Sequence, residues 1–509
     1  MTPRRHHPVN RRTNCLRASL ARLCAVLAVI ALVGSCSGGT NESKQNDKKT
    51  GDVNESPKVD PDNCPVSALD DATSPVEITV WHAYNALTQQ AIEKTAADYN
   101  ASQSKVKVNI EAQGTYPELL KKYEERLGDP SSLPDVVFAE DTNLRFLVDS
   151  GSVIPSGDCI AADPDSKEFY DDLLPSVTAT YAINDVLWPA AFGVSMPIMY
   201  VNNSQLKKAG LTDSTPLATL DDIRAAAEKI KAAGLPGVEE PVVMQLYGWY
   251  FENWITGAGQ TIVNEANGHS GLATKSTVDD KSAQEVLAWM HSMAKDGLLK
   301  AYPYSGDINQ FLAIGNQTAS ILIDGSRAVT AVNAIVANTG QQIEGTEGLS
   351  TDDLKGIELK VMPIPGLKKA GQGGAAGSAG YVVAGENPEK IAAGWDFLQY
   401  FNSPPSQVLW TTMGSYLPVT HKMDESAEIK DFFANDSGGK LLSVVKTQLQ
   451  NTDPEFPNPI IGPYDWFRTN VQSMMERVVM QGNDPKSNLT KFSSDFQSAL
   501  DDYAKEVSG

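Results

Sequence analysis

The stretch AFGVSMPIMYVNNSQLKKAGL, residues 191–211, determines how the rest of the chain is organised. Residues 192–201 form a mostly apolar run, and Asn202 follows it as a residue suited to capping a helix. This pattern predicts a buried strand that leads into a helix. Proline has no amide hydrogen to give to a sheet, so we expect the strand to bend or change sheet near Pro197. A strand that changes sheet would connect two lobes, but the same residues are equally consistent with one more core strand of a single sheet.

The length of the chain favours more than one compact unit. A single hydrophobic core seldom organises as many as 509 residues, so we expect two domains or lobes. The hydrophobic fraction of 41% is that of a globular protein.

The N-terminus has the pattern of an export signal. Six arginines precede an apolar run at residues 23–33 that is too short to span a membrane, which predicts a secretory signal at residues 1–35. The signal ends in LVGSC, which resembles the bacterial lipobox, where cleavage precedes a cysteine that carries a lipid. We therefore expect lipidation of Cys36, with an ordinary signal peptide and a chance cysteine as the alternative.

The net charge excludes some partners. Without residues 1–35 the chain keeps 36 basic and 63 acidic residues, a net charge of −27. So acidic a chain disfavours nucleic acid and anionic membrane surfaces as partners.

Cysteine use is consistent with an exported protein. Cys15 and Cys24 lie in the signal and Cys36 is the predicted lipid site, so Cys64 and Cys159 remain and are expected to form a disulfide. The sequence has no CxxC motif and no Cys/His grouping, so we expect no metal site and no cofactor.

The mature chain begins with a polar segment and continues with alternating strands and helices. Residues 36–75 are interpreted as the lipidated cysteine and a disordered tether. Strand-like segments at residues 77–82, 105–112 and 134–138 alternate with helical segments, which predicts parallel βαβ units. In such sheets the loops at the carboxyl ends of the strands are available for a ligand.

The loop GQGGAAGSAG, residues 371–380, matches no nucleotide-binding motif. It lacks the lysine and hydroxyl residue of a P-loop and the context of a dinucleotide fingerprint. We interpret it as a connection between lobes where the backbone approaches a ligand closely. No GxSxG motif is present, so the sequence gives no support for covalent catalysis.

Two segments carry side chains suited to a carbohydrate. Glu140 and Asp141 end a predicted strand; as neighbours they point to opposite faces, which suits hydroxyl binding better than a glycosidase acid and base. The segment YGWYFENW, residues 247–254, offers aromatic faces for sugar rings, although core packing is the favoured interpretation of any single ring. His82 stands alone and is interpreted as a packed or loop histidine.

An ordered set of motifs resembles the family 1 extracellular solute-binding lipoproteins, the receptors of carbohydrate ABC importers. The motifs are the lipobox, EITVWHAY, GTYPELLKKYEERLGDPSSLPDVVFAED, FGVSMPIMYVNNSQLKKAGL, ASILIDGS and GSYLPVT. The resemblance is strongest to the glycerol-3-phosphate and glycerophosphodiester binders. It implies an α/β, two-lobe periplasmic-binding-protein fold, type II-like, with interlobe crossover strands and a ligand cleft. We expect lobe 1 at residues 76–195 and 325–378 and lobe 2 at residues 196–324 and 379–509.

The resemblance also implies which residues contact the ligand. Matching positions are Tyr116, Glu140, Ser195, Trp249, Ser326, Gly377 and Tyr416. We also expect Asp141, Trp254 and Tyr464 to contact the ligand.

One departure from the phosphate binders bears on the ligand. Where they carry an arginine soon after a glycine, this chain reads Gly462-Pro463-Tyr464, with Arg468 displaced. A tyrosine cannot replace the charge of a guanidinium that binds phosphate. We therefore expect a neutral mono- or oligosaccharide, with a glycerophosphodiester as the alternative if Arg468 reaches the cleft.

The function implied by the resemblance is capture without chemistry. We expect no enzyme but a monomeric receptor on the extracytoplasmic face of the cell membrane, anchored by Cys36, that passes its sugar to the permease of an ABC transporter. A secreted glycoside hydrolase is the alternative from another class, and a ferric-ion receptor is disfavoured because no Tyr-Tyr pair is present.

Overall fold

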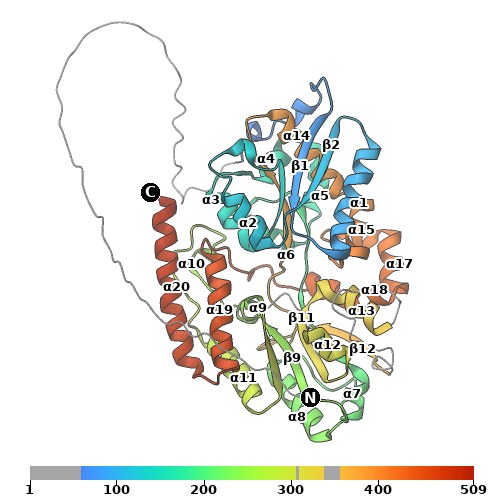
Figure 1. The fold of residues 1–509 in the computed structure, drawn as a ribbon, viewed down its shortest axis with the longest axis vertical. Helices are drawn as coiled ribbons and strands as arrows, with labels where there is room; N and C mark the ends of the chain where they lie inside the picture. The colour runs from blue at the N-terminus through green and yellow to red at the C-terminus, as the bar shows by residue number, and fades with distance from the viewer. Residues whose placement is uncertain (1–58, 305–308, 338–355, 509) are drawn as a thin grey trace, which may run out of the picture. The chain divides into compact units, whose positions relative to one another are not determined.

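The computed structural model describes residues 59–304, 309–337 and 356–508, which are built around two large sheets (Figure 1). Strand β7 (Ala191–Phe192) pairs in one sheet, and strand β8 (Pro197–Asn202) pairs in the other. The chain therefore changes sheet just before the proline, as predicted. The alternative of one more strand in a single sheet is wrong.

The first sheet has a parallel centre. In the described residues its strand order is β2-β1-β3-β13-β4, and β7 pairs with β13. Strands β1, β2 and β3 are parallel, whereas β13 is antiparallel to β3, β4 and β7. The bounds of these strands are β1 Val76–His82, β2 Val106–Ala112, β3 Val136–Glu140, β4 Val153–Ile154 and β13 Ser378–Val383. The carboxyl ends of β1, β2 and β3 therefore meet at one edge, as the βαβ pattern predicted.

The second sheet repeats this plan. Its order is β10-β9-β11-β8-β12, with β9, β10 and β11 parallel and β8 antiparallel to both of its neighbours. The bounds of these strands are β9 Glu240–Leu246, β10 Leu299–Pro303, β11 Ala319–Gly325 and β12 Leu359–Pro363. A separate hairpin joins β5 (Ala182–Ile183) to β6 (Val186–Leu187) through Asn184 and Asp185, which both have positive φ, as a two-residue hairpin turn requires.

The helices follow the predicted apolar periodicity. Capping boxes start two of them: Thr115 with Glu118 before α2, and Thr219 with Asp222 before α8. In the first part of the chain the helices are α1 Ala86–Ser102, α2 Tyr116–Glu124, α3 Leu144–Asp149, α4 Ser156–Ala162, α5 Lys167–Asp171, α6 Pro175–Tyr181, α7 Asn203–Lys208, α8 Leu220–Ala233, α9 Gly248–Thr256 and α10 Asn264–Asn267. In the rest they are α11 Lys281–Lys295, α12 Asn309–Gly315, α13 Val329–Ala337, α14 Pro388–Phe401, α15 Pro404–Gly414, α16 His421–Glu425, α17 Ala427–Asn435, α18 Ser437–Gln450, α19 Tyr464–Val479 and α20 Pro485–Ser508.

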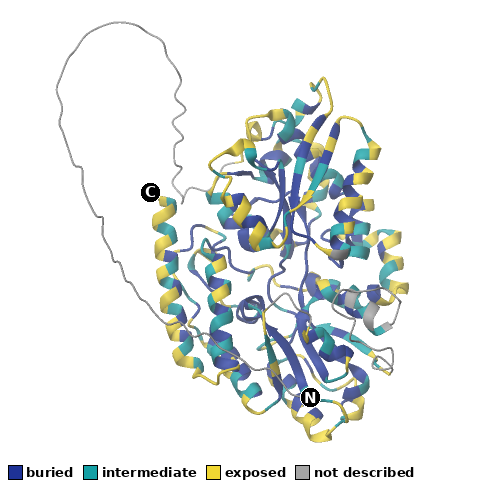
Figure 2. Cartoon of the chain, in the orientation of Figure 1, coloured by how far each residue is buried: buried dark blue, intermediate teal, exposed yellow. Residues whose placement is uncertain are grey.

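Strands β3, β8, β11 and β13 inside the two sheets are almost entirely buried, whereas β2 and β10 at the edges keep exposed residues. Elsewhere exposure concentrates on the outer sides of the helices (Figure 2). In β11, Ile321 and Ile323 belong to the core that includes α8, α11, α19 and α20, whereas Leu322 belongs to a second core that extends into the first sheet. This alternation is the two-residue period of a strand.

The small-residue loop does connect the sheets, but the chain crosses there in the opposite direction from our prediction. Strand β12, assigned to lobe 1, pairs with β8 in the second sheet, and β13, assigned mostly to lobe 2, pairs with β3 in the first. Helix α14, also assigned to lobe 2, packs on β1 and β13. The predicted lobe boundaries at residues 325–378 and 379–509 are therefore wrong in this part, because loop composition marks a crossing without giving its direction.

The last part of the predicted tether, residues 59–75, is folded and packs on the rest of the protein. Residues 59–75 contain two 3-10 helices, Pro61–Asn63 and Val66–Leu69, of which the second packs on α14 and the first on α4. Cys64 and Cys159 are both fully buried and form a disulfide between this segment and α4. This part of the predicted tether is therefore attached to the first sheet's side of the molecule.

The predicted signal at residues 1–35 and Cys36 lie outside the described residues. Within the described ranges, no helix combines the length and the apolar character needed to cross a membrane.

Removing the disulfide tests its contribution to stability. It closes a loop with a sequence separation of 95, for which the chain-entropy model gives about 4 to 5 kcal/mol. We expect the free energy of unfolding of the double variant Cys64→Ser, Cys159→Ser, measured by denaturant titration, to be lower than that of the wild type by an amount of this order. Wild-type protein that shows free thiols by mass spectrometry, or a reduced protein of unchanged stability, would contradict the prediction.

Candidate functional site

The parallel strands of the first sheet each end at a polar or aromatic side chain. Tyr84 follows β1, Tyr116 follows β2 as the first residue of α2, and Glu140 is the last residue of β3. Because these strands are parallel and adjacent, the three side chains belong to the same edge of the sheet. The rings of Tyr84 and Tyr116 are in edge contact, with centroids 6.4 Å apart.

The second sheet supplies a matching set. Tyr247 follows β9, Tyr304 follows β10, and Arg327 comes after β11 in a short 3-10 turn, Ser326–Ala328. The rings of Tyr247 and Tyr304 are stacked, with centroids 4.3 Å apart and an interplanar angle of 14°. These strands are also parallel and adjacent, so their carboxyl ends share one edge.

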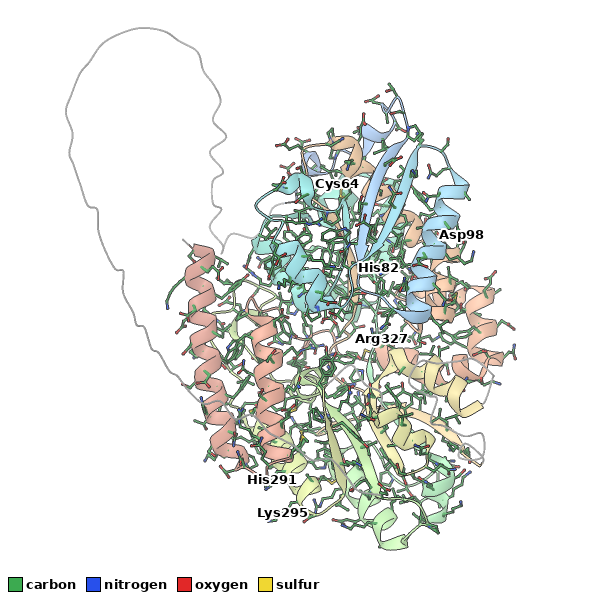
Figure 3. All side chains as sticks on the ribbon, viewed as in Figure 1. Cys64, His82, Asp98, His291, Lys295 and Arg327 are labelled. Carbon is green, nitrogen blue, oxygen red and sulfur yellow. A yellow bond between two sulfur atoms is a disulfide. The ribbon has the colours of Figure 1, made fainter. Side chains whose placement is uncertain are left out.

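Electrostatic interactions join the two sets into one site. Desolvation raises the pKa of Glu140, and the positive charges of Arg468 and Arg327 partly offset this effect. The same carboxylate raises the pKa of Tyr304, for which desolvation is again the main cause. Arg327 lies in the region between the two sheets (Figure 3). A carboxylate of the first sheet therefore acts on an arginine and a phenol of the second.

Aromatic rings from the C-terminal half complete the first sheet's side of the site. Tyr416 stacks on Trp410, with centroids 4.9 Å apart, and lies 6.4 Å from the ring of Tyr84. The hydroxyl of Tyr84 is hydrogen-bonded to Ser378. Desolvation raises the pKa of Tyr84 and of Tyr116, so both phenols are neutral donors at physiological pH.

Arg468 is anchored by a buried carboxylate. Its Nη2 donates to Oε2 of Glu252 at 2.8 Å, its Nε also contacts Glu252, and the Tyr464 hydroxyl donates to the same carboxylate at 2.8 Å. The guanidinium lies 5.0 Å from the ring centroids of Tyr247 and of Tyr464. Glu252 is fully buried, so its charge is matched inside the protein by Arg468.

Arg327 differs from Arg468 in having no such anchor. Its side chain is exposed, and within the described ranges it makes no ion pair or hydrogen bond. Its neighbours are instead the phenols of Tyr116, Tyr304 and Tyr416 and the carboxylate of Glu140. Its guanidinium donors are therefore available to a molecule that enters this space.

Asp141 connects the site to the junction of the sheets. Its Oδ1 accepts the amide hydrogen of Gly377 at 3.1 Å, and its own amide donates to the Gly377 carbonyl at 2.9 Å. Desolvation raises the pKa of Asp141 to about 7, although Arg468 and the Gly377 amide act in the opposite direction.

The predicted site residues fall into two groups. Tyr116, Glu140, Asp141 and Tyr416 come together with Arg327, and Tyr464 is linked to them through Arg468. For these residues ligand contact stays a prediction that the geometry favours.

Three of the predicted ligand residues, Ser195, Ser326 and Gly377, lie where the chain crosses between the sheets. The Ser195 hydroxyl donates to the Ala376 carbonyl at 3.1 Å, and that of Ser326 accepts the Met196 amide at 3.1 Å. A Cβ at Gly377 would lie 1.8 Å from the Gly193 carbonyl oxygen. These three residues thus have structural roles, and ligand contact by them stays a prediction.

The two predicted tryptophans have different surroundings. Trp254 is buried, stacks edgewise on Trp289 and donates its indole hydrogen to the Pro365 carbonyl at 2.7 Å, which is the core packing weighed as the alternative. Trp249 is also buried, but it lies beside Tyr247, and its indole N–H has no partner among the described residues.

Sequence reasoning missed Tyr84, Tyr304 and Arg327. The signal that could have found them is position, because each follows directly, or nearly so, the carboxyl end of a parallel strand. His82, at the end of β1, is fully buried and accepts the Tyr84 amide hydrogen on Nδ1, so it is the packed histidine that was predicted.

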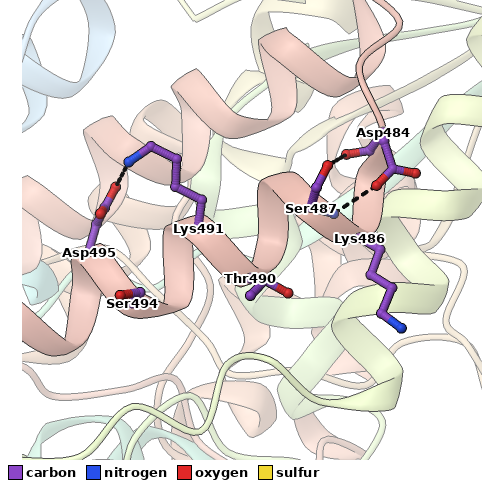
Figure 4. A pocket seen from close by; sticks show the side chains of 7 residues that line it. All are labelled: Asp484, Lys486, Ser487, Thr490, Lys491, Ser494 and Asp495. Atoms are coloured by element: carbon purple, nitrogen blue, oxygen red, sulfur yellow. Dashed lines mark hydrogen bonds and ion pairs between the residues drawn. The ribbon is translucent and has the colours of Figure 1, made fainter.

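Other candidate sites have less support. Over the part of the chain that the structure describes, no three His, Cys, Asp or Glu side chains are grouped so that they could hold a metal. A hollow along the first turns of α20 is lined by polar groups that pair with one another, such as Asp484 with Ser487 and Lys491 with Asp495 (Figure 4). It lacks aromatic side chains and unpaired buried groups.

The raised pKa of Asp141 predicts a pH effect on stability. A carboxyl group whose pKa is 3.8 when unfolded and about 7 when folded binds its proton more tightly in the folded state, so stability falls as the pH rises from about 4 to 7. Asparagine at this position does not titrate, so Asp141→Asn should not lose stability over this pH range, and its side-chain oxygen can still accept the Gly377 amide hydrogen. We expect the difference in melting temperature, variant minus wild type, to increase from pH 4 to pH 8.

Asp98→Asn, on the exposed face of α1, is the control for loss of a surface carboxylate. A difference between Asp141→Asn and the wild type that stays constant or shrinks with rising pH would contradict the prediction.

Two named proteins are similar in sequence to most of this chain. The chain is 24% identical over 376 residues to the sn-glycerol-3-phosphate-binding periplasmic protein UgpB of Rhizobium meliloti, and this alignment covers 72% of the chain and 80% of the relative. It is 23% identical over 427 residues to the UgpB of Yersinia pestis, covering 82% and 91%.

Solved structures share the fold. The GacH receptor of Streptomyces glaucescens, described unliganded and with acarbose, matches with a TM-score of 0.66 at 18% identity, covering 84% of this chain and 99% of the other. UgpB of Mycobacterium tuberculosis in complex with glycerophosphocholine matches with a TM-score of 0.65 at 16% identity, covering 84% and 99%.

The family assignment rests on a sequence model of a protein family that matches most of the fold. The model of the bacterial extracellular solute-binding proteins matches residues 94–435, about two thirds of the chain, and includes every strand of the two large sheets except β1. The chain therefore belongs to the family of bacterial extracellular solute-binding proteins, and within it resembles the glycerol-3-phosphate-binding branch.

Proposed function

We propose that this solute-binding protein of an ABC importer captures a neutral mono- or oligosaccharide between its two sheets and delivers it to the permease. The observation that carries the proposal is the meeting of both sets of strand ends around Glu140, Arg327 and five tyrosines. Phenols and a carboxylate offer donors and acceptors for hydroxyl groups, and aromatic rings offer faces for the C–H surface of a sugar.

The charge balance of the site supports a neutral ligand. The charge of Arg468 is matched by Glu252, and Arg327 faces Glu140. Asp141 and Asp465 add further acidic groups near Arg468. A phosphate would therefore meet at least as many carboxylates as arginines, which is unfavourable for an anion.

A glycerophosphodiester is the second candidate, and Arg327 is the observation that favours it. An exposed guanidinium without a protein partner suits a phosphate, which accepts two parallel hydrogen bonds from it. The relatives named for sn-glycerol-3-phosphate, and the structure described with glycerophosphocholine, are consistent with this candidate.

We further propose that the protein acts as a monomer held at the extracytoplasmic face of the membrane by a lipid on Cys36. The signal pattern and lipobox at residues 1–36 support the anchor. An intact mass of the mature protein that lacks a lipid on Cys36 would refute it. Turnover of an oligosaccharide during incubation with the pure protein would favour the glycoside hydrolase instead.

Titration calorimetry with paired ligands separates the two candidates. We expect binding of at least one neutral saccharide from a panel of glucose, maltose, trehalose and longer glucans. We expect no binding of sn-glycerol-3-phosphate or glycerophosphocholine. If a phosphate ligand binds instead, Arg327→Ala should weaken it about 10- to 100-fold, the range for hydrogen bonds to charged groups.

Arg224→Ala is the matched control, because Arg224 lies on α8 and pairs with Asp296 and Glu228 away from the site. Tight binding of glycerophosphocholine with no saccharide bound would overturn the neutral-sugar proposal in favour of the second candidate.

A further inference from the structure

Tyr304 is an aromatic side chain that folding leaves uncovered. It is 48% exposed, and the other large apolar side chains exposed among the described residues, Val59 and Met480, are aliphatic. Exposing a large ring to water forgoes the free energy of burial, so a ring kept open at the carboxyl edge of a sheet is available to a partner.

The ring of Tyr304 rests on a rigid support. One of its faces stacks on Tyr247, at 4.3 Å between centroids and 14° between planes. Tyr247 also contacts the guanidinium of Arg468, which Glu252 and Tyr464 hold in a buried network. Each layer of this support contacts the next, so the protein itself favours the orientation of Tyr304 seen in the structure.

The surroundings of Tyr304 contain hydrogen-bonding groups from both sheets. Desolvation raises its pKa although nearly half of the residue is exposed, and Glu140 raises it further while Arg327 and Arg468 lower it. The Tyr304 phenol therefore lies within electrostatic reach of Glu140 on the first sheet and of Arg327 on the second. From these positions Glu140 can accept, and Arg327 can donate, hydrogen bonds to the hydroxyl groups of a ligand.

We propose that Tyr304 is the stacking platform of the binding site: its open face receives the C–H face of a pyranose ring whose hydroxyls are bound by Glu140 and Arg327. The assignment rests on the proposed carbohydrate function and deepens it, because it identifies the ligand as a ring and not as an open-chain polyol. It also makes Tyr304, and not the buried Trp254, the aromatic specificity determinant on the second sheet. Arg468 is a positioning residue that acts through Tyr247.

The platform requires the ring of Tyr304 and not its hydroxyl. We therefore expect Tyr304→Ala to weaken a pyranoside that binds the wild type about tenfold, the order of an aromatic contact. Tyr304→Phe should bind it within about twofold of the wild type, because the ring face is kept. Calorimetry with that saccharide and with its open-chain alditol measures both effects.

Two controls keep the experiment interpretable. The melting temperature of unliganded Tyr304→Ala should fall only slightly below that of the wild type, because nearly half of the residue is exposed and only the stacking contact with Tyr247 is lost. Met480→Ala removes an equally exposed apolar side chain at the C-terminal end of α19 and should leave binding unchanged.

The outcomes separate the two proposals. If a saccharide binds the wild type and Tyr304→Ala equally well, or if Tyr304→Phe binds as weakly as Tyr304→Ala, the platform is refuted while the carbohydrate function stands. If the alditol binds as tightly as the cyclic sugar, ring stacking is also refuted. If no saccharide binds the wild type, both proposals fall together.

Discussion

The fold depends on two chain segments that cross between the sheets side by side. Ser195 and Ala376 exchange backbone hydrogen bonds of 2.8 and 3.2 Å, so the crossing before β8 is bonded to the crossing before β13. The two segments approach so closely that a Cβ at Gly377, whose φ is +151°, would overlap the Gly193 carbonyl. Only glycine fits there.

This junction determines where a ligand can be held. The parallel strands of each sheet present their carboxyl ends at one edge, and interactions among Glu140, Arg327 and Tyr304 show that the two edges are neighbours. Ser195 and Ser326, which the sequence offered as ligand contacts, are the residues whose hydroxyls secure the crossings. The proposed ligand-binding groups lie at strand ends, while the two serine hydroxyls form hydrogen bonds within the crossings. We expect this junction to act as the hinge between the two lobes.

The two arginines illustrate how a buried charge differs from an available one. Arg468 and Glu252 form a buried pair that contacts Tyr247 and Tyr464. The desolvation of such a pair offsets much of its attraction, so it is weak evidence for stability. Arg327 carries the same group without a partner among the described residues. The first arginine is held by protein groups, and under the proposed function the second donates hydrogen bonds to the ligand.

The sequence predicts the elements of this fold well and their partners less well. Periodicity located α8 and β11, and the proline at residue 197 located a crossing, because these features are local. The direction of the crossing before β13 is not local, since it depends on whether a strand pairs with β3 or β8. In the same way, Trp254 in α9 and Tyr304 after β10 are both aromatic residues that follow strands of the second sheet, and only tertiary packing buries the first and exposes the second. Arg327 shows no sequence pattern of its own, because its role follows from the groups that the other sheet brings to it.

The central claim, that one solute bridges two sheets joined at a hinge, is tested most directly by small-angle X-ray scattering of the protein with and without a saccharide shown by calorimetry to bind. The structure brings Glu140 of one sheet within electrostatic reach of Tyr304 of the other. A bound solute that contacts both favours this arrangement over more open forms of the free protein, so the account predicts a smaller radius of gyration in the saturated protein. A radius of gyration that does not change at saturation would contradict it.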